Sequence, residues 1–460
     1  MTVPKRPEAG VPRAYAFPGS DRHVLANGMT VITAPLRRLP VVTVLAIVDA
    51  GGESDALSQA GLGALTAKAL SEGTRQRSGD ALADAFESLG GELFTDAGWT
   101  RAECGITVLG ARLEPTLHLV AEVLREPAFR EQDVMRLRAE RLAELLQIEA
   151  EPRGLADDQF LRIAFGPATR YAEPVAGSTA SVAGLSTDDV RRHFKERYLP
   201  ANVTLIIVGD VDGAEAMKLS ERIFDEWKPD RPTRAPDPGK ATRSRRAVHV
   251  VHRADAPQTE LRVGHPSVPR SHPEFHAMSV MNAILGGLFN SRINLNLRER
   301  HAFTYGAFSS FDWRREASLF EVSTAVRSDV TAAALTEILN EIDRIRAADV
   351  SESELSLARD YLTGVFPIRF ETTAAIADAL ATRESFRLEE TYYDQYRSRI
   401  SAVSVADVKR VAEQILDPSS LQILAVGDPG MIRGPIEALE LGEVHQVAAE
   451  QASPTSMITA

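Results

Sequence analysis

Residues 186–211 read STDDVRRHFKERYLPANVTLIIVGDV, and residues 404–429 read SVADVKRVAEQILDPSSLQILAVGDP. The two segments align without a gap at a constant offset of 218 residues. Each opens with the N-cap pattern Ser-x-x-Asp, continues with a helical period, stops at a proline and ends in an apolar strand followed by Gly-Asp. Agreement over this length predicts two copies of one domain, each of about 220 residues.

The pattern outside the repeat predicts the fold class. Apolar runs indicate strands at residues 41–48, 101–109, 202–208, 260–265, 320–324 and 421–426. Amphipathic periods indicate helices that include residues 59–71, 80–89, 114–125, 131–148, 188–198, 274–284, 330–346 and 352–366. Grouped strands followed by runs of helices favour α+β domains, each a mainly antiparallel sheet with helices packed on one face.

The domain boundaries follow from composition. A chain of 460 residues is too long for one ordinary core. The proline- and charge-rich stretch 229–247 has few apolar residues to bury and predicts a linker. We therefore expect an N-terminal domain over 20–228, a C-terminal domain over 248–435 and a C-terminal tail over 436–460.

Bulk properties exclude several classes of protein. The formal charge of −12 argues against a nucleic-acid partner. The longest apolar run, residues 41–48, is far shorter than the roughly 20 residues that span a bilayer, so we expect no transmembrane segment. The single cysteine, Cys104, allows neither an intramolecular disulfide nor a cysteine zinc cluster. Residues 1–20 have no apolar h-region, which favours the cytoplasm; the periplasm stays open if a signal has been removed.

Three segments carry a resemblance to a known family. They read HVLANGMTVI at 23–32, AGLGALTAKALSEGT at 60–74 and NAILGGLFNSRINLNLRERHAFTYG at 282–306. Together with the domain repeat, they make residues 20–430 resemble the processing-peptidase branch of the pitrilysin/insulinase zinc metallopeptidases. This resemblance implies a mitochondrial-processing-peptidase-like fold, and an active site enclosed in a chamber between two similar halves or subunits.

The catalytic helix of that family carries His-x-x-Glu-His, because residues four apart on a helix can place two histidines on one zinc ion. In this chain the corresponding positions fall on residues 64–68, where Ala64, Ala67 and Lys68 replace both histidines and the glutamate base. A lysine cation repels a divalent metal. Glu144 lies near the place of the family's further glutamate ligand, but one carboxylate does not hold zinc, and a solvated surface residue is the favoured interpretation. We expect no metal and no catalytic residue in this chain alone.

Two residues of the C-terminal half match a pair that the family brings towards its substrate. Arg298 and Tyr305 in LRERHAFTY fall on the family's arginine and tyrosine. A guanidinium and a phenol are donors suited to a peptide carbonyl or to the oxyanion that develops on it. The resemblance implies substrate binding at the zinc of a partner subunit. The alternative is a surface arginine and a tyrosine that packs at the end of a strand.

Two further segments have competing interpretations. His272 and His276 have the spacing of a zinc helix, but Pro273 places His272 before the helix, so metal binding is not favoured. Residues 90–97 correspond to the strand at the sheet edge on which the family binds peptides. An ordinary strand is the favoured interpretation here, because no zinc ligands accompany it.

The leading functional hypothesis is a non-catalytic subunit of a heterodimeric zinc metalloendopeptidase. It would be inactive alone, would pair with a related zinc-bearing subunit, and would complete the chamber that holds the peptide substrate. The alternative is a purely structural or scaffold homologue with no role in proteolysis. A third hypothesis, an independent enzyme with a relocated site, has no convergent residues in its favour.

Overall fold

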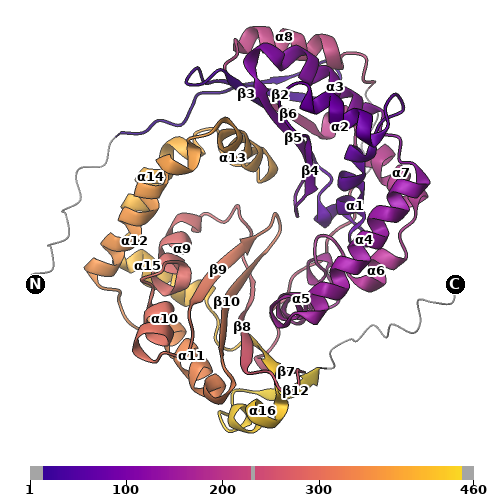
Figure 1. Cartoon of the computed structure of the whole chain (residues 1–460). Helices are drawn as coiled ribbons and strands as arrows, with labels where there is room; N and C mark the ends of the chain where they lie inside the picture. The colour runs from indigo at the N-terminus through magenta and orange to yellow at the C-terminus, as the bar shows by residue number, and fades with distance from the viewer. Residues whose placement is uncertain (1–13, 229–233, 448–460) are drawn as a thin grey trace, which may run out of the picture.

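The computed structural model describes residues 14–228 and 234–447, and its strands form two six-stranded sheets (Figure 1). The first sheet has the order β1-β2-β6-β3-β5-β4. Its strands are β1 (Asp21–Val24), β2 (Thr30–Pro35), β3 (Val41–Val48), β4 (Phe94–Ala97), β5 (Ala102–Leu109) and β6 (Val203–Gly209). The second sheet has the order β12-β7-β11-β8-β10-β9. Its strands are β7 (Ala247–His252), β8 (Gln258–Ser267), β9 (Ala307–Trp313), β10 (Ser318–Arg327), β11 (Gln422–Gly427) and β12 (Glu443–Val447).

The two sheets share one topology over five strands each. In the first, β2 runs parallel to β6, and the remaining neighbours β6-β3-β5-β4 are antiparallel. In the second, β7 and β11 form the equivalent parallel pair, followed by the antiparallel neighbours β11-β8-β10-β9. The outermost strands differ, because β1 is antiparallel to β2 whereas β12 is parallel to β7.

Helices connect the strands in both halves. The first half contains α1 (Leu62–Ala69), α2 (Gly79–Glu87), α3 (Leu113–Arg125), α4 (Glu131–Ala150), α5 (Pro152–Phe165), α6 (Thr179–Ala183), α7 (Thr187–Arg197) and α8 (Gly213–Phe224). The second contains α9 (Phe275–Asn282), α10 (Arg292–Asn294), α11 (Thr331–Ala347), α12 (Glu352–Val365), α13 (Thr373–Ser385), α14 (Tyr392–Ala402), α15 (Val405–Ile415) and α16 (Pro429–Glu437). No helix of the described residues is long and apolar enough to cross a membrane.

The internal repeat is confirmed in atomic detail. The helices α7 and α15 begin and end at positions that differ by 218 residues, and each opens with a complete capping box, formed by Ser186 with Asp189 and by Ser404 with Asp407. The strands β6 and β11 follow, and their last residues, Gly209 and Gly427, differ by the same 218. The predicted fold, two homologous α+β domains, is therefore correct.

The outer face of each sheet is covered by helices of its own half. In the first half, buried side chains of β3, β5 and β6 pack with those of α1, α3, α7 and α8 in one apolar cluster. In the second half, β8, β10 and β11 pack in the same way against α9, α11, α15 and α16. These two clusters are the cores of the predicted arrangement, in which helices pack on one face of each sheet.

The inner faces are joined by an exchange of equivalent helices. Helix α13 of the second half packs on β3 and β6 of the first sheet, and α5 of the first half packs on β8 and β11 of the second (Figure 1). Apolar clusters fill both contacts. Leu380 of α13, for example, is completely buried in the cluster with Leu45 and Ile206 of the first sheet. Each half therefore completes the core of the other.

Two sequence expectations need comment. The predicted tail 436–460 is partly wrong, because β12 lies within it and pairs with β7 in the second sheet; residues 448–460 lie outside the described residues. Residues 229–233 of the predicted linker also lie outside them. The remainder of the linker, up to residue 246, has no regular secondary structure.

Candidate functional site

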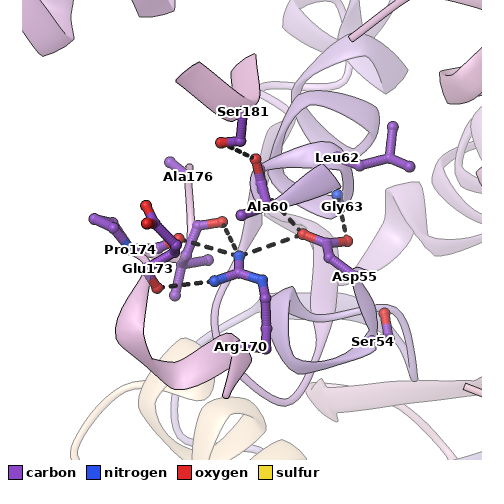
Figure 2. A network of polar contacts seen from close by, with 12 residues as sticks. Ser54, Asp55, Ala60, Leu62, Gly63, Arg170, Glu173, Pro174, Ala176 and Ser181 are labelled. Atoms are coloured by element: carbon purple, nitrogen blue, oxygen red, sulfur yellow. Dashed lines mark hydrogen bonds and ion pairs between the residues drawn. The ribbon is translucent and has the colours of Figure 1, made fainter. Parts of the chain in front are cut away.

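The helix α1 carries positions 64–68, and its start is fixed by one buried carboxylate (Figure 2). Asp55 accepts hydrogen bonds from the backbone N–H of Gly61 at 3.1 Å and of Gly63 at 2.9 Å. Gly61 has φ 98°, a left-handed conformation that glycine adopts without strain, and a Cβ there would lie 2.9 Å from the carbonyl oxygen of Ala176. The anchor therefore sets where the helix begins and how it is oriented.

Arg170 holds Asp55 in turn (Figure 2). Its Nη2 lies 3.4 Å from Asp55 Oδ2 and donates to the carbonyl of Pro174 at 3.0 Å, and its Nη1 donates to the carbonyl of Glu173 at 2.8 Å. Both charged groups are buried. Burial raises the pKa of Asp55 to about 6, although Arg170 and the two backbone N–H groups act in the opposite direction.

A second buried carboxylate beside Asp55 connects the two halves. Glu53 accepts a hydrogen bond from the Tyr171 hydroxyl at 3.1 Å, and Arg315 of the second half lies 2.8 Å from its other oxygen. Burial raises the pKa of Glu53 to about 7 in spite of Arg315. The sequence reasoning missed both carboxylates. An Asp six residues before a glycine that opens a helix was the available signal for Asp55.

Positions 64, 67 and 68, which the resemblance assigns to the zinc motif, present no metal ligands on α1. Ala64 is half-buried, Ala67 is fully buried in the core, and Lys68 is exposed. The Lys68 ammonium lies 3.8 Å from Glu144 Oε1 on α4, whose other oxygen is 3.2 Å from Arg141. The Glu144 side chain is half-exposed and contacts α1 through Lys68. It therefore lies where a third metal ligand from a neighbouring helix would be needed. Two methyl groups and an ammonium do not fit a divalent cation.

The histidine pair at the start of α9 does not converge either. His272 lies before the helix, as predicted, whereas His276 is buried against Tyr392 and Tyr396. Burial lowers the pKa of His276 to about 4, with Arg399 and Arg270 acting in the same direction. In the described part of the chain, no group of three or more His, Cys, Asp or Glu side chains is placed to hold a metal ion.

Tyr305 projects from a turn that is itself rigid. Its side chain is 92% exposed, and its hydroxyl makes no hydrogen bond within residues 14–228 and 234–447. The neighbouring residues are fixed, because Thr324 Oγ1 donates to the carbonyl of Gly306 at 2.9 Å and lies 3.0 Å from Thr304 Oγ1. The strand β9 then begins at Ala307, whose N–H donates to Asn294 Oδ1 at 3.0 Å. The Tyr305 phenol is therefore exposed to solvent and does not pack at the end of a strand, contrary to the alternative interpretation.

Arg298 lies in the π-helical turn Leu295–Arg300, which continues α10. Its side chain is partly exposed, with Nε 3.5 Å from the carboxylate of its neighbour Glu299. Its Cζ lies 4.5 Å from the centroid of the Phe289 ring. Local π-helical turns are frequent at functional sites. Of the residues that the sequence singled out, Lys68 and Glu144 are in contact in the first half, whereas Arg298 and Tyr305, both among the described residues, lie in the second half without a contact to each other.

The strand β4 lies at the edge of the first sheet, as the resemblance implies, although it covers only the end of the segment 90–97. Phe94 lies opposite Gly105 of β5, and a Cβ at Gly105 would lie 2.6 Å from its ring. The glycine therefore makes room for the aromatic side chain. One side of β4 has no partner strand among the described residues.

Comparison with known proteins places this architecture, two similar α+β halves, among the peptidases. Residues 31–177 match the family described as insulinase (peptidase family M16), and residues 184–362 match the peptidase M16 inactive domain. The chain belongs to the insulinase, or M16, family of peptidases.

Individual relatives cover almost the whole chain. An uncharacterized zinc protease of Streptomyces coelicolor is 26% identical over 439 residues, which are 93% of this chain and 92% of the relative. A probable mitochondrial-processing peptidase subunit beta of Arabidopsis thaliana is 23% identical and covers 88% of this chain and 77% of the relative. The crystal structure of a peptidase M16 inactive domain from Pseudomonas fluorescens shares the fold with a TM-score of 0.83 at 23% identity, over 89% of this chain and 98% of that one.

Proposed function

We propose that this chain is the non-catalytic subunit of a heterodimeric zinc metalloendopeptidase. In this proposal it pairs with a related zinc-bearing chain, completes the chamber that encloses the peptide, and supplies Arg298 and Tyr305 to the partner's site. The chain alone neither holds zinc nor cleaves peptides.

One observation carries the proposal. The chain combines a cation, Lys68, at a position where its family binds zinc with a displayed Arg298–Tyr305 pair that has almost no partners of its own. The ammonium of Lys68 faces Glu144, so positive charge is already supplied to the carboxylate that would otherwise face the metal. In this proposal the chain supplies no hydrolytic centre of its own, and it presents two donors for a peptide bound at the partner's zinc.

The chemistry assigned to the two donors is electrostatic. A guanidinium offers N–H groups in a planar fork, and a phenol offers one O–H, so together they can hold the carbonyl oxygen next to the scissile bond. Donors placed where negative charge develops stabilise the transition state more than the bound substrate. The partner's zinc would supply the activated water.

The test uses the complex with a zinc-bearing relative from the same source. Arg298→Ala and Tyr305→Phe should each leave assembly intact but lower kcat/KM by about tenfold to a thousandfold, the range for loss of a positioned donor. Arg298→Lys should rescue poorly, because it keeps the charge without the fork. Arg300→Ala, an exposed arginine of the same helical turn, is the matched control.

Two outcomes would contradict the proposal. Failure to form a complex of twice the chain's mass with any zinc-bearing relative would remove the subunit role; a homodimer of the isolated chain is compatible with it. Wild-type turnover from an assembled Arg298→Ala/Tyr305→Phe complex would leave only the scaffold alternative.

A further inference from the structure

We propose that Phe289 is a positioning residue for Arg298: its ring holds the guanidinium by stacking and so leaves the N–H donors free for a peptide. This inference rests on the proposed function for its role in turnover, but not for its geometry. It adds a residue that the sequence reasoning did not single out.

The contact has the geometry of a cation–π interaction. Arg298 Cζ lies 4.5 Å from the Phe289 ring centroid, within the range of about 6 Å for such pairs. The donors of a guanidinium lie in its plane, whereas a stacked ring contacts its face. Stacking can therefore fix the side chain without using a single N–H group. Phe289 is 57% exposed, so the ring is accessible and not part of a core.

Two other arginines that lie over aromatic rings also donate hydrogen bonds within the chain. Arg314 is stacked on Trp99, but it also donates to the carbonyl of Tyr171 at 3.0 Å and to Asp312 at 2.8 Å. Arg270, stacked on Phe275, donates to the hydroxyl of Tyr392. Arg314 and Arg270 are buried, and their contacts are structural.

The Arg298 guanidinium differs from both. Within the described residues its only acidic neighbour is Glu299, at 3.5 Å, and no hydrogen bond from its nitrogens to another residue is formed. An exposed pair between adjacent residues is weak. Arg298 is therefore oriented mainly by an aromatic ring, and its fork stays available.

A single buried side chain ties Phe289 to the turn that displays Tyr305. Asn294 Nδ2 donates to the Phe289 carbonyl at 2.7 Å, and its Oδ1 accepts from the N–H of Ala307 at 3.0 Å. Asn294 is 1% exposed, so both hydrogen bonds are shielded from water. The loop that carries the ring and the turn that carries the phenol are thus set by one amide group.

This arrangement has a physical advantage for binding. A free arginine loses rotamer freedom when it grips a ligand, and this loss weakens the interaction. A guanidinium already stacked on Phe289 has lost part of that freedom before the peptide arrives. Removing the ring should therefore reduce the contribution of Arg298 without abolishing it.

The first experiment tests the geometry in the isolated chain. With isotope-labelled arginine, the side-chain proton resonances of Arg298, assigned by their loss in Arg298→Lys, should show a ring-current shift. Phe289→Leu should remove that shift, and Phe289→Tyr should retain it. Phe308→Leu, which removes an exposed ring from the neighbouring strand, should leave it unchanged. An Arg298 shift that survives Phe289→Leu overturns the inference.

The second experiment tests the role in the complex with the zinc-bearing partner. Phe289→Leu should lower kcat/KM by about twofold to fivefold, the effect of losing one exposed cation–π contact. Phe289→Tyr should retain wild-type turnover, and Phe289→Leu should have no further effect in an Arg298→Ala background.

The failures are distinguishable. If Arg298→Ala itself has no effect on turnover, the proposed function fails while the ring-current result still decides the stacking geometry. Equal losses from Phe289→Leu in the wild-type and Arg298→Ala backgrounds would show that Phe289 acts independently of Arg298. That result would overturn the positioning role.

Discussion

Placing two histidines on α1 should convert this chain into a zinc-binding protein. The change is Ala64→His with Lys68→His, which places imidazoles four residues apart on one helix face beside the existing Glu144. Ala67 stays unchanged, because it is fully buried and a glutamate there would bury a carboxylate. Two histidines and one glutamate are a known zinc ligand set.

The geometry favours binding. Ligand atoms of a tetrahedral zinc site lie about 3.4 Å apart, given metal–ligand bonds of about 2.1 Å. The Lys68 ammonium lies 3.8 Å from Glu144 Oε1, so the side chain at position 68 and the carboxylate already face each other. Glu144 loses the Lys68 cation in the variant, which leaves its Oε1 without that ion pair, while Arg141 stays 3.2 Å from Oε2.

The two substitutions should lower the unfolding free energy without zinc, and zinc binding should raise it. Without metal, the variant loses a half-exposed ion pair, worth at most about 1 kcal/mol, and replaces an alanine by a poorer helix former, at about 0.5–0.7 kcal/mol. With free zinc at a hundred times Kd, binding to the folded state contributes about 2.7 kcal/mol. Unfolding free energy should therefore rise with zinc in the variant and stay unchanged in the wild type.

The assay is equilibrium dialysis with elemental analysis, together with denaturant unfolding at increasing zinc. The variant should hold one zinc per chain, whereas the wild type should hold none. Adding Glu144→Ala to the double histidine variant is the matched control and should weaken binding by at least tenfold, since one of three protein ligands is lost. Absence of zinc from the variant, or indifference to Glu144→Ala, would refute the assignment of residues 64–68 to the degenerate motif.

Two further predictions concern stability and use unfolding of the purified chain. Leu380→Ala should lower the unfolding free energy by about 2–5 kcal/mol, because the Leu380 side chain is fully buried between α13 and the first sheet. The control Ile368→Ala, at an exposed site, should change the unfolding free energy by less than about 0.5 kcal/mol. Similar losses at both sites would contradict the exchanged-helix core. Burial raises the pKa of Glu53 to about 7 in the folded chain, from about 4.5 in the unfolded chain. The contribution of Glu53 to the unfolding free energy is therefore fully present below pH 4.5 and is lost as the pH rises through 7. Relative to Glu53→Gln, which does not titrate, the wild type should lose on the order of 2–3 kcal/mol between pH 4.5 and 8; parallel pH profiles would show that Glu53 titrates normally.

Much of the fold could be predicted because local signals agreed with each other. The repeat located α7, β6, α15 and β11, since capping boxes and helix-ending prolines depend on a few adjacent residues. The same reasoning placed strands near β3, β5, β8 and β10. It placed no strand at β12, because a short edge strand with half-exposed residues has no strong apolar pattern.

The candidate site was predictable only as separate positions. The family resemblance assigned Arg298, Tyr305 and positions 64–68, but it said nothing about their surroundings. The stacking of Phe289 on Arg298 joins residues from a loop and a helical turn, and the ion pair of Lys68 with Glu144 joins two helices. Such contacts depend on tertiary placement. Glu144 is exposed, as the sequence predicted, but its ion pair with Lys68 was not predicted.

The exchange of α5 and α13 was beyond the reasoning applied to the sequence, yet one signal for it was present. Residues 41–48 form an uninterrupted apolar run, which is typical of a strand buried on both faces rather than one. Val44 and Ala46 of β3 point into the outer core of their own half, whereas Leu45 and Ile47 meet α13. A sheet with helices on one face only would have given an alternating pattern. The run therefore required a second cover, and in a chain with two copies of one domain the equivalent helix of the other copy can provide it. Each copy then needs the other to complete its core, which explains why a repeat of about 220 residues occurs here as an interlocked pair.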